Sequence, residues 1–383
     1  MDAEGEALPI LTGLRLLGRT KTTRIGLLTA QVARDEFRLT DSTNASALRV
    51  TRNVLKRSSV GALMTSADVD GVQRQTMGLD LRLRSTELIP KRTVELTAAG
   101  AMSFGPSFDD RGETWRIALA WPNAIWNARM SWERIGADYD PALGFVALSG
   151  VDRISLSTHH THYIKDPKSV LRNRQFSPFS GSIELDDSSG EWGHYAAHIV
   201  PVELVSHSGL WGKLSLDAKG YRLSGDWEIL DGFTAPAGEH HSLGAHAMIA
   251  NGWHRRLGLF AMFSEGQYFG GRMTSSRLWA QMKVSPRLRI STSNGLYWMR
   301  GGGSEAIGRD HNLRVRVSLN RSLHGSLFGQ WNSQTDETLI NLRIRIIPAP
   351  GADAYIVLNQ GLDADGADAG TSLQGKLVWR FGV

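Results

Sequence analysis

Residues 313–320 have the sequence LRVRVSLN, in which Leu, Val, Val and Leu alternate with Arg, Arg, Ser and Asn. Because successive side chains leave a β-strand on opposite sides, this stretch predicts a strand with one apolar and one polar face. The same period of two recurs in residues 77–84, 115–121 and 340–346. No segment predicts a long amphipathic helix, so the pattern indicates an all-β protein.

The alternating runs continue from about residue 13 to the end of the chain, separated by short turn signals such as Asn251-Gly252 and Ser188-Ser189-Gly190. Their spacing predicts roughly sixteen to twenty strands of about ten residues each, a typical length for the strands of a transmembrane barrel. No Pro- or Ser-rich linker interrupts the chain, so residues 1–383 are predicted to form a single domain. A run of about eighteen apolar residues, which a membrane-spanning helix needs, is absent.

The composition excludes several classes of protein. Because the chain has no cysteine, disulfide frameworks, thiolate metal sites and a Cys nucleophile are excluded. A hydrophobic fraction of 41% excludes wholesale disorder. The net charge of +5 comes from basic residues dispersed over many strands, without the basic aromatic cluster of a nucleic-acid-binding module, so no nucleic-acid partner is predicted.

Two all-β architectures use this many strands. A soluble propeller or sandwich turns its apolar faces inward, whereas a membrane barrel turns them to lipid and keeps a polar lumen. Arginines that repeat along the polar faces, the tryptophans Trp115 and Trp121 near strand ends, and the within-strand glycines Gly325 and Gly329 all favour the membrane barrel. The sequence therefore predicts an antiparallel transmembrane β-barrel of the bacterial outer membrane.

The end of the chain supports this prediction. An apolar face alternates with Gln374, Lys376, Val378 and Arg380 up to the last residue, and its members are Leu373, Gly375, Leu377, Trp379, Phe381 and Val383. Outer-membrane barrels end on such a strand because the barrel-assembly machinery recognises it. The predicted partners are therefore outer-membrane lipid and that machinery. An ordinary edge strand is the alternative explanation.

Several local sequences resemble a known family. They are Pro9–Gly13 with Leu16–Arg19, Arg49–Leu55 with Ser58–Gly61, Asp138–Pro141 with Leu143–Val146, and Pro348–Val357. The family is a domain of unknown function, an outer-membrane β-barrel that usually follows a family 9 carbohydrate-binding-module-like domain, and the resemblance spans nearly the whole chain. It implies a barrel in the outer membrane and an association with glycans. It implies no reaction and no catalytic residues.

The beginning of the sequence departs from that family. Members have a signal peptide, the carbohydrate-binding-like module and an opening strand before this region, whereas this sequence begins Met1-Asp2-Ala3-Glu4-Gly5-Glu6, without a basic or apolar leader. We therefore expect either a truncated sequence or a shortened member that lacks the module and the first strand. A barrel without its first strand would leave an unpaired edge, which lipid does not tolerate.

Basic residues are the candidate ligand-binding groups. The arginines on predicted polar faces or near the mouth of the barrel are Arg49, Arg52, Arg82, Arg84, Arg314, Arg316, Arg343 and Arg345. Such residues can contact an anion or a sugar. Alternatively, they pair with lipid phosphates or with neighbouring acids such as Asp70 and Asp80.

Other chemistry-bearing groups give weaker signals. His159, His160 and His162 make a metal site conceivable, and Ser157 shares a strand face with His159 as a hydrolase pair would. The three carboxylates of Asp363–Asp368 lack the later Glu of a calcium loop, so an acidic hairpin loop is favoured. No catalytic residue, metal or cofactor is therefore predicted.

The leading hypothesis is a porin-like, non-enzymatic channel or solute- and glycan-binding barrel. The alternatives are a barrel hydrolase acting on lipids or glycans, and a plugged structural or assembly barrel.

Overall fold

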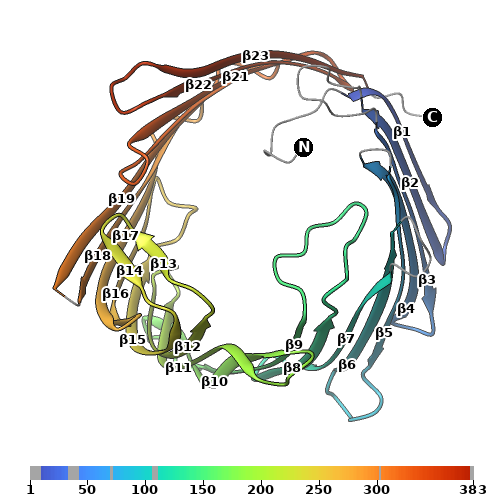
Figure 1. Ribbon diagram of the computed structural model, residues 1–383, viewed down its shortest axis with the longest axis horizontal. Coiled ribbons are helices and arrows are strands. Elements are labelled where there is room, and N and C mark those ends of the chain that lie inside the picture. The colour runs from blue at the N-terminus through green and yellow to red at the C-terminus, as the bar shows by residue number, and fades with distance from the viewer. Residues whose placement is uncertain (1–9, 33–42, 70–71, 106–110, 302, 380–383) are drawn as a thin grey trace. The chain divides into compact units, whose positions relative to one another are not determined.

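The computed structural model describes residues 10–32, 43–69, 72–105, 111–301 and 303–379. The chain divides into two compact units, the first unit (residues 1–160 and 179–197) and the second unit (residues 161–178 and 198–383). Regular structure in the described residues consists of strands (Figure 1). Among these residues, no helix has the length and apolar character needed to span a membrane.

The first unit contains strands joined mainly by short connections. Their bounds are β1 (Ile10–Arg19), β2 (Thr23–Val32), β3 (Thr43–Val54), β4 (Ser58–Val69), β5 (Val72–Ser85), β6 (Val94–Phe104), β7 (Arg111–Pro122), β8 (Trp126–Ile135) and, for its greater part, β9 (Val151–Tyr163). β10 (Leu171–Asp186) and β11 (Trp192–Ser206) contribute residues to both units.

The second unit repeats this organisation. Its strands are β12 (Trp211–Leu223), β13 (Trp227–Leu230), β14 (Phe233–Ala235), β15 (Gly238–Ala250), β16 (Leu257–Tyr268), β17 (Gly271–Lys283), β18 (Leu288–Gly301), β19 (Ser304–Ser318), β20 (Leu323–Asn332), β21 (Glu337–Ala349), β22 (Ala352–Leu362) and β23 (Asp368–Trp379). Of the strands described, 21 belong to extended antiparallel sheet and β13 and β14 form a separate hairpin. This count exceeds the predicted sixteen to twenty, because several turns are too short to stand out in the sequence.

Strand register places apolar side chains of neighbouring strands on a common face. In the first unit Leu48 pairs with Met64, Met64 with Met77, and Met77 with Met102. Directly paired residues point to the same side of an antiparallel sheet. One continuous apolar face therefore crosses β3 to β6, and the alternate residues form a polar face.

Exposure of the apolar face distinguishes the two predicted architectures. Leu79 is 70% exposed, Leu119 is 55% exposed and, in the second unit, Phe263 is 51% exposed. A soluble protein would bury such side chains in a core, whereas a barrel presents them to lipid. The apolar faces of both units therefore have the character of a lipid-facing surface.

β8 and β9 are joined by residues 136–150, here named the 136–150 segment. This segment lies on the polar face of the first unit (Figure 1). Its backbone donates two hydrogen bonds to the sheet, from Asp140 N to Ser103 Oγ over 3.0 Å and from Ala142 N to Thr76 Oγ1 over 3.0 Å. Asp140 also forms an ion pair with Arg74. Thr76 and Ser103 are buried beneath it, so the segment is docked against the sheet.

A second insertion lies on the polar face of the second unit. The hairpin β13–β14 places Phe233 against Met299 of β18 and Ala306 of β19, and all three side chains are buried. Asp231 N donates a hydrogen bond of 2.9 Å to Gln334 Oε1. This cluster of buried apolar side chains attaches the insertion to the sheet.

Several tryptophans lie on the apolar faces near strand ends. The indole N–H groups of Trp132, Trp298 and Trp331 each donate a hydrogen bond to a carboxylate, over 3.0, 2.7 and 2.8 Å respectively. An apolar ring combined with a polar contact is the behaviour expected of an interfacial girdle. Trp121 occupies a similar position in β7, whereas Trp115 lies further from the strand end.

The predicted terminal strand corresponds to β23 as far as Trp379. Leu373 and Leu377 lie on its apolar face, paired with Leu358 and Ala354 of β22. The closing residues Phe381 and Val383 lie outside the described residues.

Candidate anion-binding site on the polar face

Basic side chains on neighbouring strands of the second unit are directly paired. Lys283 of β17 is opposite Arg289 of β18, and Arg289 is opposite Arg316 of β19. Adjacent strands lie about 4.8 Å apart. Register therefore places three cationic side chains in one row on the same face.

The row continues through Ser326 of β20 to Arg343 of β21. We name Lys283, Arg289, Arg316 and Arg343 the basic ladder. A pocket of about 660 Å³ is lined by its first three members together with Arg256 and Arg287. The ladder thus faces open space that a solute can enter.

Little within the described chain neutralises the ladder. None of the ion pairs among the described residues includes Arg289, Arg316 or Arg343. Lys283 Nζ donates to the carbonyl oxygens of Trp253 and His254, over 2.9 and 3.0 Å. Like charges held on adjacent strands create a positive potential that attracts an anion.

Two further predicted arginines flank the ladder. Arg314 lies over the ring of Phe328, with 4.4 Å between its guanidinium carbon and the ring centroid. Arg345 is paired with the buried carboxylate of Asp353 at 2.6 Å. Arg314 therefore adds positive charge to the same face, whereas the charge of Arg345 is compensated.

The predicted arginines of the first unit have different surroundings. Arg49 pairs with Asp80 at 2.5 Å, and Arg82 pairs with Glu95 at 2.7 Å. Arg84 shares their face and is directly opposite Glu95. Arg49 and Arg82 therefore pair with neighbouring acids of the sheet, as the alternative explanation has it.

Arg52 is separated from the other candidates. It is paired in register with Val60 and lies on the face of Val50, opposite to that of Arg49. The eight predicted arginines therefore do not form one site. Arg314, Arg316 and Arg343 come together, and sequence reasoning missed Lys283 and Arg289.

A signal for the two missed residues was present. Lys283 and Arg289 lie three residues before and three residues after Pro286, the centre of the connection between β17 and β18. Because a hairpin pairs residues at equal distances from its turn, this symmetry alone places the two cations opposite each other. Their pairing with Arg316 depends on the register of the next hairpin.

The second unit also contains a Ser-His-Asp arrangement that the sequence did not indicate. His246 Nδ1 lies 2.6 Å from Ser264 Oγ, and its Nε2 contacts the carboxylate of Asp217. The three residues come from β16, β15 and β12, so only tertiary pairing brings them together. Ser264 is buried, with 4% of its surface exposed, beside a cavity of about 50 Å³.

The other candidate groups are dispersed or local. His160 is in ring contact with Trp126, and His159 is on the opposite face of β9, paired with Asn127. Asp363 Oδ1 accepts hydrogen bonds from the backbone of Asp365 and Ala367, so this carboxylate shapes the β22–β23 turn. The described residues contain no group of three or more His, Cys, Asp or Glu side chains arranged to hold a metal ion.

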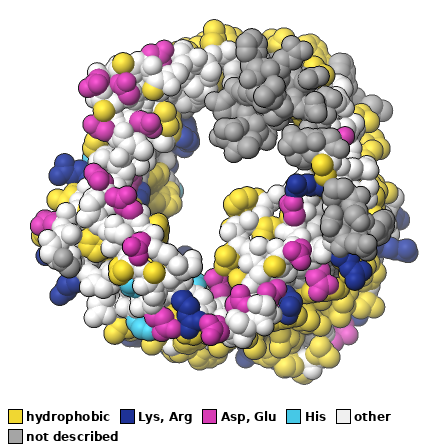
Figure 2. All heavy atoms as spheres, in the orientation of Figure 1, with side chains coloured by type: hydrophobic (Ala, Val, Ile, Leu, Met, Phe, Trp, Pro, Cys, Tyr) yellow, Lys and Arg dark blue, Asp and Glu magenta, His cyan; other side chains and the backbone are white. Residues whose placement is uncertain are grey.

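Charge differs between the two strand ends of the second unit. The connections β15–β16, β17–β18 and β19–β20, at the end nearer the basic ladder, carry Arg255, Arg256, Arg287 and Arg321. Connections at the other end carry Asp226, Asp231, Asp336, Asp363 and Asp365. Figure 2 shows acidic side chains gathered over the β22–β23 connection. The second unit is therefore electrically asymmetric along its strands.

Comparison with solved structures gives the fold. The ferric-catecholate import receptor Fiu from E. coli K12 matches with a TM-score of 0.52 and 8% identity, covering 97% of this chain and 72% of that chain. The siderophore receptor PirA from Pseudomonas aeruginosa matches with a TM-score of 0.60 and 10% identity, covering 95% and 74%. A variant of the ferric enterobactin receptor PfeA from the same organism matches with a TM-score of 0.58 and 7% identity, covering 94% and 73%.

The chain has the fold of an outer-membrane β-barrel. The predicted all-β, antiparallel fold class is confirmed, and the barrels it matches are those of ferric-catecholate, ferric enterobactin and siderophore receptors. No family model and no curated protein sequence matches the chain. The resemblance to the barrel family with a carbohydrate-binding module therefore stays a prediction.

Proposed function

We propose that this chain is a non-enzymatic outer-membrane barrel that binds and conducts small anionic solutes along the basic ladder. The observation that carries the proposal is the direct pairing of Lys283, Arg289 and Arg316 without carboxylate partners among the described residues. Three adjacent cations repel one another, and this repulsion is relieved when an anion binds between them. The proposed location is the bacterial outer membrane, where the exposed apolar faces contact lipid.

The class of solute follows from the same chemistry. A guanidinium presents paired N–H donors that match carboxylate, sulfate and phosphate oxygens. Ferric-catecholate and ferric enterobactin are the cargoes named for two of the similar barrels. The family resemblance adds glycans. An acidic oligosaccharide is therefore the solute that fits both the anion-binding chemistry of the guanidinium groups and the family resemblance.

The test is conductance of the purified barrel in planar bilayers. We expect channels that prefer chloride over potassium and that an acidic oligosaccharide blocks. Arg289→Gln combined with Arg316→Gln is expected to lower the anion preference and weaken block about tenfold, the usual effect of losing a charge-assisted hydrogen bond. Lys56→Gln, which removes one charge from an exposed pair with Glu87, is the control for losing a positive charge outside the ladder. Unchanged selectivity in the double variant would contradict the proposal.

The Ser264–His246–Asp217 arrangement favours a second candidate function, a barrel-embedded hydrolase. In this function His246 would take the Ser264 proton, and Asp217 would orient the imidazole. A fluorophosphonate probe is expected to label wild-type protein but not Ser264→Ala. Ser157→Ala is the control, since Ser157 shares a face with His159 but lies in the first unit. Absence of labelling in folded wild-type protein leaves the three residues as a structural polar network.

A further inference from the structure

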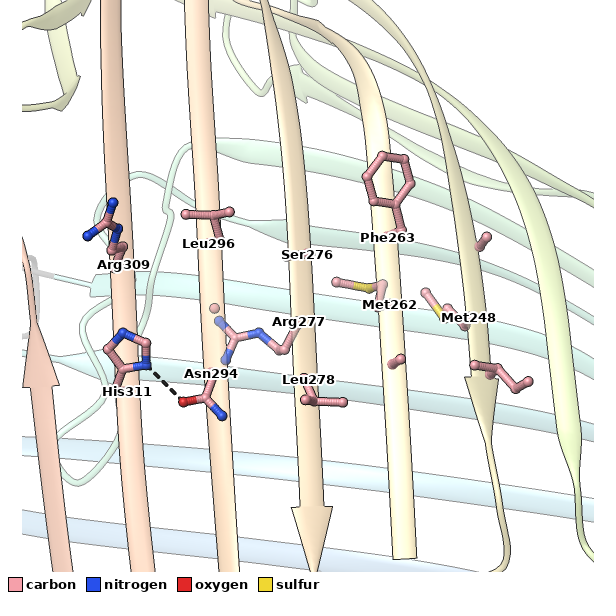
Figure 3. A pocket seen from close by; sticks show the side chains of 14 residues that line it. Met248, Met262, Phe263, Ser276, Arg277, Leu278, Asn294, Leu296, Arg309 and His311 are labelled. Atoms are coloured by element: carbon pink, nitrogen blue, oxygen red, sulfur yellow. Dashed lines mark hydrogen bonds between the residues drawn. The ribbon is translucent and has the colours of Figure 1, made fainter.

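The apolar face of the second unit contains a groove of about 860 Å³ that crosses β15 to β19 (Figure 3). Phe263, Leu278 and Leu296 contribute large apolar side chains to it. Ala261 pairs directly with Leu278, and Ala247 pairs with Phe263. The small alanine side chains beside bulky neighbours leave a depression in the lipid-facing surface.

The groove has a polar end at β19. Leu296 is paired with Arg309, and Asn294 is paired with His311, so these polar residues share the apolar face. His311 Nδ1 lies 2.8 Å from Asn294 Oδ1, as Figure 3 shows. The His311 ring stacks on Trp331 with 5.4 Å between centroids. The polar end is therefore built and held in place by neighbouring side chains.

Arg309 is the one charged member of this end. It is exposed, and no ion pair among the described residues includes it. Its carboxylate-bearing neighbour Asp310 lies on the opposite face, paired with Arg277 at 2.9 Å. A guanidinium on a lipid-facing surface is costly unless an anionic group meets it there.

The position of Arg309 along its strand fits the lipid headgroups. The indole of Trp298 donates a hydrogen bond to Glu305. Along the strands, Trp298 lies between Arg309 and the turn that joins β18 to β19. Tryptophans of this kind mark the boundary between headgroups and acyl chains. Arg309 lies just inside that boundary, and its long side chain can extend toward the headgroup layer.

We propose that the groove is a binding site for a phosphate-bearing membrane lipid. The Arg309 guanidinium binds the phosphate oxygens, Asn294 and His311 line the headgroup end, and an acyl chain lies across Phe263 and Leu278. An amphiphile with one anionic and one apolar part matches the groove, which has a cationic end and an apolar body. The site is independent of the solute and depends only on the apolar face lying in a bilayer.

Native mass spectrometry of the barrel released from neutral detergent tests the proposal. Added phosphatidylglycerol is expected to give a retained one-to-one adduct, whereas diacylglycerol or inorganic phosphate at equal concentration is not, because each lacks one half of the lipid. Arg309→Gln is expected to weaken retention about tenfold. Arg321→Gln, which removes the same charge at a β19–β20 turn position, is the matched control and is expected to bind like wild type.

A second variant tests the apolar part of the site. Ala261→Trp fills the groove without changing charge, and it is expected to reduce phosphatidylglycerol retention while inorganic phosphate stays unbound. Heat-dependent gel migration of each variant verifies that it is folded. Equal lipid retention by wild type, Arg309→Gln and Ala261→Trp would overturn the proposal. So would a lipid-independent dimer that Ala261→Trp abolishes, since a second copy of the chain would then occupy the groove.

Discussion

Single residues in this chain acquire their roles from the partner that strand register gives them. Arg49 and Arg316 both occupy polar-face positions of strands, yet Arg49 meets Asp80 while Arg316 meets another arginine. The alternating pattern predicted the polar face for both residues, whereas Arg52, grouped with them, lies on the opposite face of β3. It could not identify the partner, because a partner depends on turns and bulges elsewhere in the chain. This is why the sequence grouped Arg49 and Arg82, which meet carboxylates, with Arg316, which meets another cation.

The pair Arg345–Asp353 gives a prediction at this scale. Asp353 is almost fully buried and Arg345 donates to it over 2.8 and 2.6 Å. Arg345→Leu removes both of these charge-assisted hydrogen bonds from a buried carboxylate, and we expect it to lower the urea concentration at the midpoint of unfolding. The measurement is a urea titration of the barrel in detergent.

The double variant Arg345→Leu/Asp353→Leu is the control for that prediction. Replacing both partners by apolar groups also removes the buried carboxylate, so most of the lost stability should return. A double variant that is no more stable than Arg345→Leu would show that the cost came from lost packing.

Elements were predicted well where their pattern is local. The runs 77–84, 115–121, 313–320 and 340–346 fall within or across the ends of β5, β7, β19 and β21. The 136–150 segment and the β13–β14 hairpin were not foreseen as polar-face insertions, because their docking depends on contacts with strands distant in sequence. The Ser264–His246–Asp217 arrangement was missed for the same reason.

The docking of the 136–150 segment gives a prediction at the element scale. A Cβ atom on Gly112 would collide with the backbone of Asp138, so close approach of the segment requires glycine there. We expect Gly112→Val to displace the segment and make it sensitive to limited proteolysis. Single-channel conductance should rise if the segment narrows the pathway.

Gly18→Val is the matched control, because nothing lies within 4 Å of the position that a Cβ atom at Gly18 would occupy. It is expected to leave both cleavage and conductance unchanged. If Gly112→Val resists proteolysis as well as wild type does, the hydrogen bonds to Thr76 and Ser103 are sufficient to hold the segment.

At the scale of the whole molecule, the described residues have extensive antiparallel pairing but few buried apolar side chains. Stability in such a chain comes from hydrogen-bonded ladders shielded by lipid or detergent, not from an internal core. We expect purified protein in SDS to migrate differently before and after boiling, because the paired strands resist SDS until heated. If boiled and unboiled samples migrate identically, and the unboiled protein shows no β-sheet signal in circular dichroism, a membrane-barrel fold would be contradicted.

The opposite charges at the two strand ends of the second unit have an electrical consequence. If anions pass along this face, those that approach from the arginine-bearing connections are concentrated at entry, whereas those that approach from the aspartate-bearing connections are repelled. The barrel would then rectify current, passing more at one polarity than at the other. We expect measurable rectification at 0.1 M salt, where the Debye length is about 10 Å. Rectification should disappear at 1 M salt, where the Debye length is about 3 Å. In a bilayer, the current through this protein would therefore depend on the sign of the applied voltage at low ionic strength but not at high ionic strength.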